Sequence, residues 1–239
     1  MTLRVLQTVA ENQAAREEMR QAGFSYWPRT ARPRLRDWLL LRSPIPVGEM
    51  NKSWDVLQTV RLLQERLPAD APILDMGAWS SEILCCLHML GFTGLTGIDL
   101  NSAVRSMPFE NAINWVVGDM MATPFPDASM MAITSISAIE HGFALRPLFR
   151  EVSRLLAPGG LFIASTDYWP EKIDTNGIRM FGLEWTIFSQ EEIAAVLSTA
   201  GEYGLRAVGD LNFNAAEPTV DCVERRFTFV WFALEKVPS

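Results

Sequence analysis

The chain has 239 residues, and its 49% of hydrophobic and 21% of charged residues are typical of a globular domain with a sizeable core. Its net charge of −7 disfavours sequence-independent binding to nucleic acid or to an anionic membrane. Three cysteines without CxxC spacing and two histidines argue against a disulfide framework and a zinc cluster, so we expect no metal.

The first 70 residues predict a mostly helical extension. The sequence MTLRVLQTVAENQ lacks the apolar core of a signal peptide, and no apolar run approaches the length of a membrane span, so we expect a cytoplasmic protein. Lys52–Leu67 has the pattern of an amphipathic helix, and irregular structure with a short helix around Asp37–Leu41 is expected before it. Apolar residues also recur at helical spacing near the N-terminus, at Leu3, Leu6, Val9 and Ala10. We therefore expect residues 1–70 to cap a domain formed by residues 71–239.

From residue 71 onward, strand and helix signals alternate. The predicted strands are Ile73–Met76, Leu95–Asp99, Asn114–Val117, Met130–Ser135 and Leu161–Thr166. The predicted helices are Glu82–Leu90, Pro147–Leu156, which Pro158–Gly160 should end, and Gln190–Ala200 with Ser189 as its N-cap. Two closing strands, Arg206–Asn212 and Arg226–Leu234, suggest a hairpin. The pattern predicts an α/β fold with a doubly wound, mostly parallel seven-stranded sheet and an antiparallel terminal strand.

Carboxylates follow three successive strands of this sheet. Asp75 lies at the end of the first strand, Asp99 ends the second, and Asp119 follows the third. The spacing between the first two matches that at which a carboxylate accepts hydrogen bonds from a bound ribose. Since ligands of doubly wound sheets bind at the carboxyl ends of the strands, these residues predict a nucleotide-type cofactor site.

In this order the segments resemble the class I S-adenosylmethionine-dependent methyltransferases, which have a Rossmann-like fold. The resemblance rests on ILDMGAWSS, GIDLN, VVGDMMATPFPDASM, SISAIEHG and LFREVSRLLAPGGLFIAST, and is closest to a small-molecule group with PFPD and EH motifs. It implies S-adenosyl-L-methionine as the cofactor. The implied cofactor contacts are Asp75, Gly77, Ala78, Trp79 and Ser81 in the first loop, Asp99 at the ribose, Leu100, Asp119 and Met120 at the adenine, and Ser137 near the sulfonium.

The first loop departs from the family pattern. Trp79 and Ser81 stand where the family usually has its second and third glycines. Because Trp79 cannot freely adopt a positive φ, the loop has to turn differently or carry strain. The Trp79 ring either fills space in the core or touches the cofactor or substrate, and the sequence leaves both interpretations open.

Residues that follow the fourth and fifth strands are candidates for the acceptor side. Asp167, His141 and Tyr168, in this order, are candidate bases for removing a proton from the acceptor, and Glu140 is expected to orient or cap. The aromatic segment 165–188 either forms a pocket wall or packs against the domain. Five N-terminal arginines form a solvated cluster or bind a phosphorylated acceptor: Arg29, Arg32, Arg34, Arg36 and Arg42.

The function expected from these features is methyl transfer from S-adenosyl-L-methionine to an oxygen or nitrogen of a small-molecule acceptor. Neither nucleic acid nor a membrane is expected as a partner, and a homodimer is left open. Two alternatives remain: an oxidoreductase with a nicotinamide cofactor, and a methyltransferase-fold protein that binds a partner without catalysis.

Overall fold

The computed structural model describes residues 3–27, 46–142 and 144–237. Its main sheet has the order β1-β11-β6-β5-β2-β3-β4, in which β4, β3, β2, β5 and β6 run parallel and β11 is antiparallel to β6. These strands are β1 (Leu3–Val5), β2 (Ile73–Met76), β3 (Leu95–Asp99), β4 (Asn114–Val117), β5 (Met130–Ile136), β6 (Leu156–Tyr168) and β11 (Arg225–Lys236). Short strands β9 (Leu205–Ala207) and β10 (Val220–Cys222) pair with β11, and β7 (Arg179–Met180) and β8 (Leu183–Glu184) form a separate hairpin. The predicted α/β fold with a mostly parallel sheet is confirmed.

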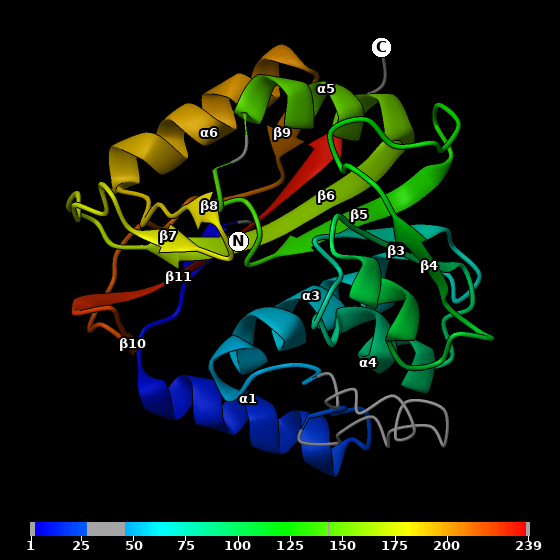
Figure 1. The fold of residues 1–239 in the computed structure, drawn as a ribbon, viewed down its shortest axis with the longest axis horizontal. Coiled ribbons are helices and arrows are strands. Elements are labelled where there is room, and N and C mark those ends of the chain that lie inside the picture. Colours follow the sequence, from blue (N-terminus) through cyan, green and yellow to red (C-terminus); the bar gives the residue numbers. More distant parts are fainter. Residues whose placement is uncertain (1–2, 28–45, 143, 238–239) are drawn as a thin grey trace.

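Helices cover both faces of the sheet (Figure 1). One face carries α5 (Leu145–Leu155) and α6 (Gln190–Glu202), and the other carries α3 (Ser53–Arg66) and α4 (Ile83–Met89), with α1 (Val9–Gln21) packed on α3. Two 3-10 helices, η1 (Met50–Lys52) and η2 (Ser102–Ser106), complete the described elements. In the described part of the chain, no helix is both long and apolar enough to cross a membrane.

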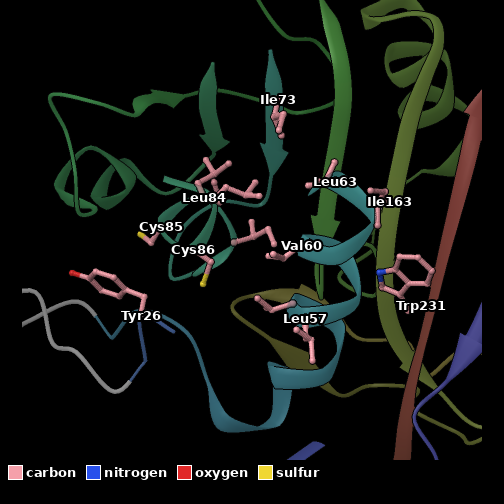
Figure 2. Packing of buried hydrophobic residues seen from close by; sticks show 14 of the residues in the cluster. Tyr26, Leu57, Val60, Leu63, Ile73, Leu84, Cys85, Cys86, Ile163 and Trp231 are labelled. Carbon is pink, nitrogen blue, oxygen red and sulfur yellow. The ribbon is translucent and has the colours of Figure 1, made fainter. Parts of the chain in front are cut away.

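The two faces of the sheet bury two separate apolar clusters. Along β6, Phe162 packs with the α5 and α6 side, whereas Ile163 packs with the α3 and α4 side, as the alternation of a strand requires. Figure 2 shows Ile163 beside Leu63 of α3, with Trp231 of β11 close by. A central strand with apolar residues on both faces is buried between the two layers of helices. This packing fixes the place of the strand in the sheet, and therefore which strand ends meet at the site.

The two adjacent cysteines of α4 lie in the apolar cluster on the α3 and α4 side of the sheet. Cys85 and Cys86 are both free thiols with 0% of their surface exposed (Figure 2). Burial raises the pKa of each thiol above its ordinary value, so both stay protonated and unreactive. They therefore act as small buried hydrophobic residues.

Three predictions about element boundaries are wrong. Residues Leu3–Val5 form a strand and not a helix, because they pair with β11 and cover its edge, and α1 starts only at Val9. The Pro158–Gly160 segment does not separate α5 from β6, since β6 starts at Leu156 and carries the segment as an irregularity in its pairing with β5.

The third difference is that only the start of the predicted strand Arg206–Asn212 is a strand, β9, and that β10 provides the tight hairpin with β11. The predicted helix around Asp37–Leu41 and the five N-terminal arginines lie outside the described residues.

Candidate cofactor and acceptor site

A cavity of about 760 Å³ opens at the carboxyl ends of β2, β3, β5 and β6. This is the edge at which ligands bind in doubly wound sheets, and the volume is in the range of small-molecule sites. Its walls come from the loops after these four strands and after β4, from residues 46–56, from the β7–β8 hairpin, and from β10 and β11. Segments far apart in the sequence therefore meet at one site.

The loop after β2 turns without the usual glycines. Gly77 has φ +80°, and a Cβ at this position would lie 2.7 Å from the Ala138 side chain, so glycine is required here. The second left-handed position is Ser80, with φ +66°, and not Trp79. Trp79 thus keeps an ordinary backbone conformation, and its N–H donates to Asp99 Oδ2 at 3.0 Å.

The segment before α3 holds Ser80 in its unfavourable conformation. The N–H of Gly48 donates to the Ser80 carbonyl at 2.8 Å, and Ser80 Oγ donates to the Pro46 carbonyl at 2.6 Å. A non-glycine residue with this backbone costs about 1–2 kcal/mol, which two hydrogen bonds offset. The missing glycine is therefore compensated by residues 46–48 of the N-terminal extension.

A buried ion pair joins the same extension to the start of α4. Arg16 of α1 pairs with Glu82, the N-cap residue of α4, and their side chains are 2% and 1% exposed. The guanidinium also donates to Ser25 Oγ at 3.0 Å and to Ser53 Oγ at 2.9 Å. Glu82 lines the cavity and accepts from the Trp27 N–H at 3.1 Å. The N-terminal extension thus fixes one wall of the cavity.

Asp99 stands at the cavity wall after β3. Its Oδ1 accepts from the Asn101 N–H at 2.7 Å, and its Oδ2 accepts from Trp79. Each carboxylate oxygen can accept more than one hydrogen bond, so Asp99 keeps acceptor capacity for a ligand. Leu100, 62% exposed, lines the cavity next to it.

Three buried polar atoms on residues that line the cavity have no hydrogen-bond partner among the described residues. They are Trp79 Nε1, Ser137 Oγ and His141 Nδ1. A buried polar group without a partner costs about 1–3 kcal/mol, so each such group needs an explanation, and a ligand bound in the cavity would supply one. A cofactor with both a nucleoside and an amino-acid part fits this set, because it offers several donors and acceptors to the orphaned atoms and to Asp99.

The opposite end of the cavity contains an ion pair among aromatic rings. Lys52 Nζ lies 3.6 Å from Asp167 Oδ1 and 3.4 Å from the centroid of the Phe229 ring. The other carboxylate oxygen of Asp167 accepts from Trp185 Nε1 at 2.7 Å. All four residues line the cavity, so this end of it contains an ion pair set against aromatic side chains.

Three further titratable groups surround this pair. Burial, and to a lesser degree the charge of Asp167, raises the pKa of Glu140 to about 8, and Glu140 accepts from Thr166 Oγ1 at 3.1 Å. Burial also raises the pKa of Asp55, which accepts from Ser165 Oγ at 2.7 Å. Burial lowers the pKa of His141. Burial therefore favours the protonated form of Glu140 and the neutral form of His141.

The structure brings most of the predicted site residues to the cavity. Those that line it are Gly77, Trp79, Ser81, Asp99, Leu100, Met120, Ser137, His141 and Asp167. Asp75 and Ala78 lie beneath the loop, almost without exposed surface, and Asp75 accepts from Thr134 Oγ1 at 2.7 Å with its pKa raised by burial to about 7. Asp119, whose Oδ1 accepts from the Met121 N–H at 2.8 Å, is not among the lining residues.

The placement of Tyr168 as a candidate base is wrong. Neighbouring residues of a strand point to opposite faces, so Asp167 faces the cavity while Tyr168 packs in the cluster under α5 and α6. Its hydroxyl donates to the Phe213 carbonyl at 2.7 Å, and burial raises its pKa to about 12. Tyr168 is therefore a core residue.

Sequence reasoning missed two residues of the site, Lys52 and Glu82. Both stand at the starts of helices, where a charged residue is ordinary. Only the three-dimensional packing of α3 on the sheet brings Lys52 to Asp167, so the local pattern contains no signal for either residue.

Comparisons with known proteins agree with this geometry. Residues 74–164 match the family model described as "Methyltransferase domain". A sterol 24-C-methyltransferase of Gibberella zeae is 33% identical in an alignment over 85 residues that covers 31% of this chain and 22% of that protein, so the matched stretch is a small part of the relative.

Solved structures share the fold over a larger part of the chain. The geranyl diphosphate C-methyltransferase of Streptomyces coelicolor A3(2) superposes with a TM-score of 0.56 at 18% identity, over 80% of this chain and 84% of that one. The [4+2]-cyclase SpnF superposes with a TM-score of 0.57 at 14% identity, over 80% and 85% of the two chains. Residues 74–164 thus match a methyltransferase domain, and the sheet that contains them has the fold of the class I S-adenosylmethionine-dependent methyltransferases.

Proposed function

We propose that the chain binds S-adenosyl-L-methionine and transfers its methyl group to a small, largely apolar acceptor. The observation that carries the proposal is the joined pair of loops after β2 and β3, in which the Trp79 N–H is bonded to Asp99 at the wall of the cavity. These loops lie within the matched methyltransferase domain. Gly77, Asp99 and the orphaned atoms of Trp79 and Ser137 would hold the cofactor.

The chain's own contribution would be alignment and exclusion of water. When bound, the cofactor supplies a methyl group that its sulfonium already activates. The protein then has to hold the acceptor in line and keep solvent out, which is a large part of the rate in such reactions. We propose that residues 1–70 act as the cap, since Gly48, Lys52 and Val56 line the cavity.

The acceptor side suggests an apolar molecule. Trp185, Phe227, Phe229 and Phe181 line the cavity around the Lys52–Asp167 pair. The sequence led us to expect an oxygen or nitrogen acceptor, whereas the names of the sterol 24-C-methyltransferase and of the geranyl diphosphate C-methyltransferase support carbon. We therefore propose a carbon acceptor first. The methyl carbon of the product, formed from 13C-methyl-labelled cofactor, has NMR shifts that differ between bonds to carbon, nitrogen and oxygen.

Equilibrium dialysis tests the cofactor directly. The protein should retain labelled S-adenosylmethionine and leave labelled NAD free, since both ligands present a ribose but only one matches the methyltransferase domain. If the protein retained only NAD, the alternative function, that of an oxidoreductase with a nicotinamide cofactor, would be favoured instead. Retention of neither ligand would favour a protein that has the fold without the reaction.

A further inference from the structure

The ion pair at the polar end of the cavity is unusually open. The 3.6 Å between Lys52 Nζ and Asp167 Oδ1 exceeds the 2.7–2.9 Å that is usual for a charge-assisted hydrogen bond. The pair is nevertheless fixed on both sides, because Trp185 Nε1 holds the second oxygen of Asp167 and the Phe229 ring lies against the ammonium. Side-chain exposure is 17% for Lys52 and 8% for Asp167, so both reach the cavity without facing bulk water.

Other titratable groups lie around the pair. Burial raises the pKa of Glu140 and of Asp55 and lowers that of His141, so burial favours the uncharged form of each. Glu49, Asp221 and Cys222 line the cavity as well, so carboxylates other than Asp167 also face it. A ligand that brought a net negative charge into this end would meet these carboxylates, whereas a neutral ligand able to exchange a proton with the pair would add no net charge.

We propose that the Lys52–Asp167 pair is the acceptor subsite and that it takes an acceptor with an ionisable hydroxyl, of the phenol or enol class, on a flat apolar body. The inference rests on the proposed function and adds the class of substrate to it. The hydroxyl donates to Asp167 and accepts from Lys52, while the aromatic side chains cover the apolar body. Lys52 and Asp167 then both contact substrate, and Trp185 is a positioning residue.

The subsite also activates the acceptor by proton transfer. The hydroxyl proton passes to the Asp167 carboxylate, and the electron pair of the O–H bond stays on the acceptor oxygen, which faces the Lys52 ammonium. One anion still faces one cation after the transfer, so the net charge of the buried site is unchanged. The oxyanion makes its own oxygen, and the carbon beside the hydroxyl-bearing carbon, nucleophilic enough for methyl transfer.

A pair of matched probes tests the subsite: 1-naphthol, which has an ionisable hydroxyl, and 1-methoxynaphthalene, which has none. Both are titrated into the protein with and without S-adenosylhomocysteine. We expect 1-naphthol to bind about 10- to 100-fold more tightly, the effect of one charge-assisted hydrogen bond in a buried site. We also expect bound 1-naphthol to ionise, seen by its absorbance, at a lower pH than the free compound.

Substitution of Lys52 distinguishes specific recognition of the hydroxyl from non-specific binding of an aromatic compound to the apolar cavity. Lys52→Met should abolish both the preference for 1-naphthol and the shift of its ionisation, while 1-methoxynaphthalene binds as before. Lys52→Arg should restore at least part of both effects. Equal affinity of the two probes for the unaltered protein, or an ionisation of bound 1-naphthol at a higher pH than in water, would overturn the proposal even if Lys52→Met does not fold.

Titration of S-adenosylhomocysteine distinguishes a wrong acceptor class from a failure of the proposed function. If the protein binds S-adenosylhomocysteine but treats the two probes alike, only the acceptor class is wrong. If it does not bind S-adenosylhomocysteine, the cofactor assignment fails whatever the probes show.

Discussion

Replacing Arg16 by methionine removes the cation of a fully buried ion pair and keeps most of the side-chain volume. Glu82 would then be left in the interior without its charge partner, with the Trp27 N–H still donating to it. Loss of one partner from a buried pair costs about 3–5 kcal/mol, which is a large part of the roughly 5–15 kcal/mol that stabilises a domain. We expect Arg16→Met to lower the free energy of unfolding by that amount.

Urea unfolding followed by circular dichroism measures the effect. Glu82→Gln in the Arg16→Met background should restore about 1–3 kcal/mol, because it removes the unpaired charge. Arg61→Met is the matched control: its pair with Glu18 is exposed, with side chains 53% and 48% accessible, and should contribute under about 1 kcal/mol. If Arg16→Met cost no more than Arg61→Met, or if the two changes at Arg16 and Glu82 were additive, the pair would not fix the cavity wall as reasoned.

Two further predictions concern the loop after β2 and the strand beneath it. Trp79→Phe removes the orphaned indole N–H but keeps an aromatic ring, and should weaken S-adenosylhomocysteine binding about 5- to 30-fold in calorimetry, the effect of one hydrogen bond; unchanged affinity would show that the ring only fills space. The pKa of Asp75 is raised by burial from 3.8 to about 7, so the folded state retains a proton that the unfolded state loses between these pH values. Stability should therefore fall as pH rises from about 4 to 7 and level off above, and Asp75→Asn should flatten this part of the profile in thermal unfolding. An equally steep profile in Asp75→Asn would assign the pH dependence to other groups, of which Glu140 is the first candidate.

Elements with a strong local pattern could be predicted from the sequence. The strands β2, β3 and β4 have the predicted bounds. The central strand β2 is buried along its whole length, and such a strand needs the continuous apolar run that the sequence shows. Ser189 caps α6 in a reciprocal arrangement with Glu192, as its chemistry favours. The chain-order position of Asp99 after the second strand also sufficed to place it at the cavity.

Features that depend on distant partners could not be predicted. Leu3–Val5 is a strand only because β11 offers an edge, and its three residues are too few to distinguish strand from helix by periodicity. Arg16 and Glu82 are 66 positions apart, and each has an ordinary local context. The turn without glycine at Trp79 has its explanation in Ser80 and in the bonds from Pro46 and Gly48, which no local pattern indicates.

The central claim is that the loops after β2 and β3 hold S-adenosylmethionine through Asp99. Isothermal titration of S-adenosylhomocysteine into the unaltered protein, Asp99→Ala and the exposed control Asp70→Ala tests it most directly. We predict saturable binding to the unaltered protein and to Asp70→Ala, and a loss of about 1–3 kcal/mol in Asp99→Ala, or roughly 5- to 150-fold in affinity. No heat of binding at millimolar ligand, or an affinity that Asp99→Ala leaves unchanged, would contradict it.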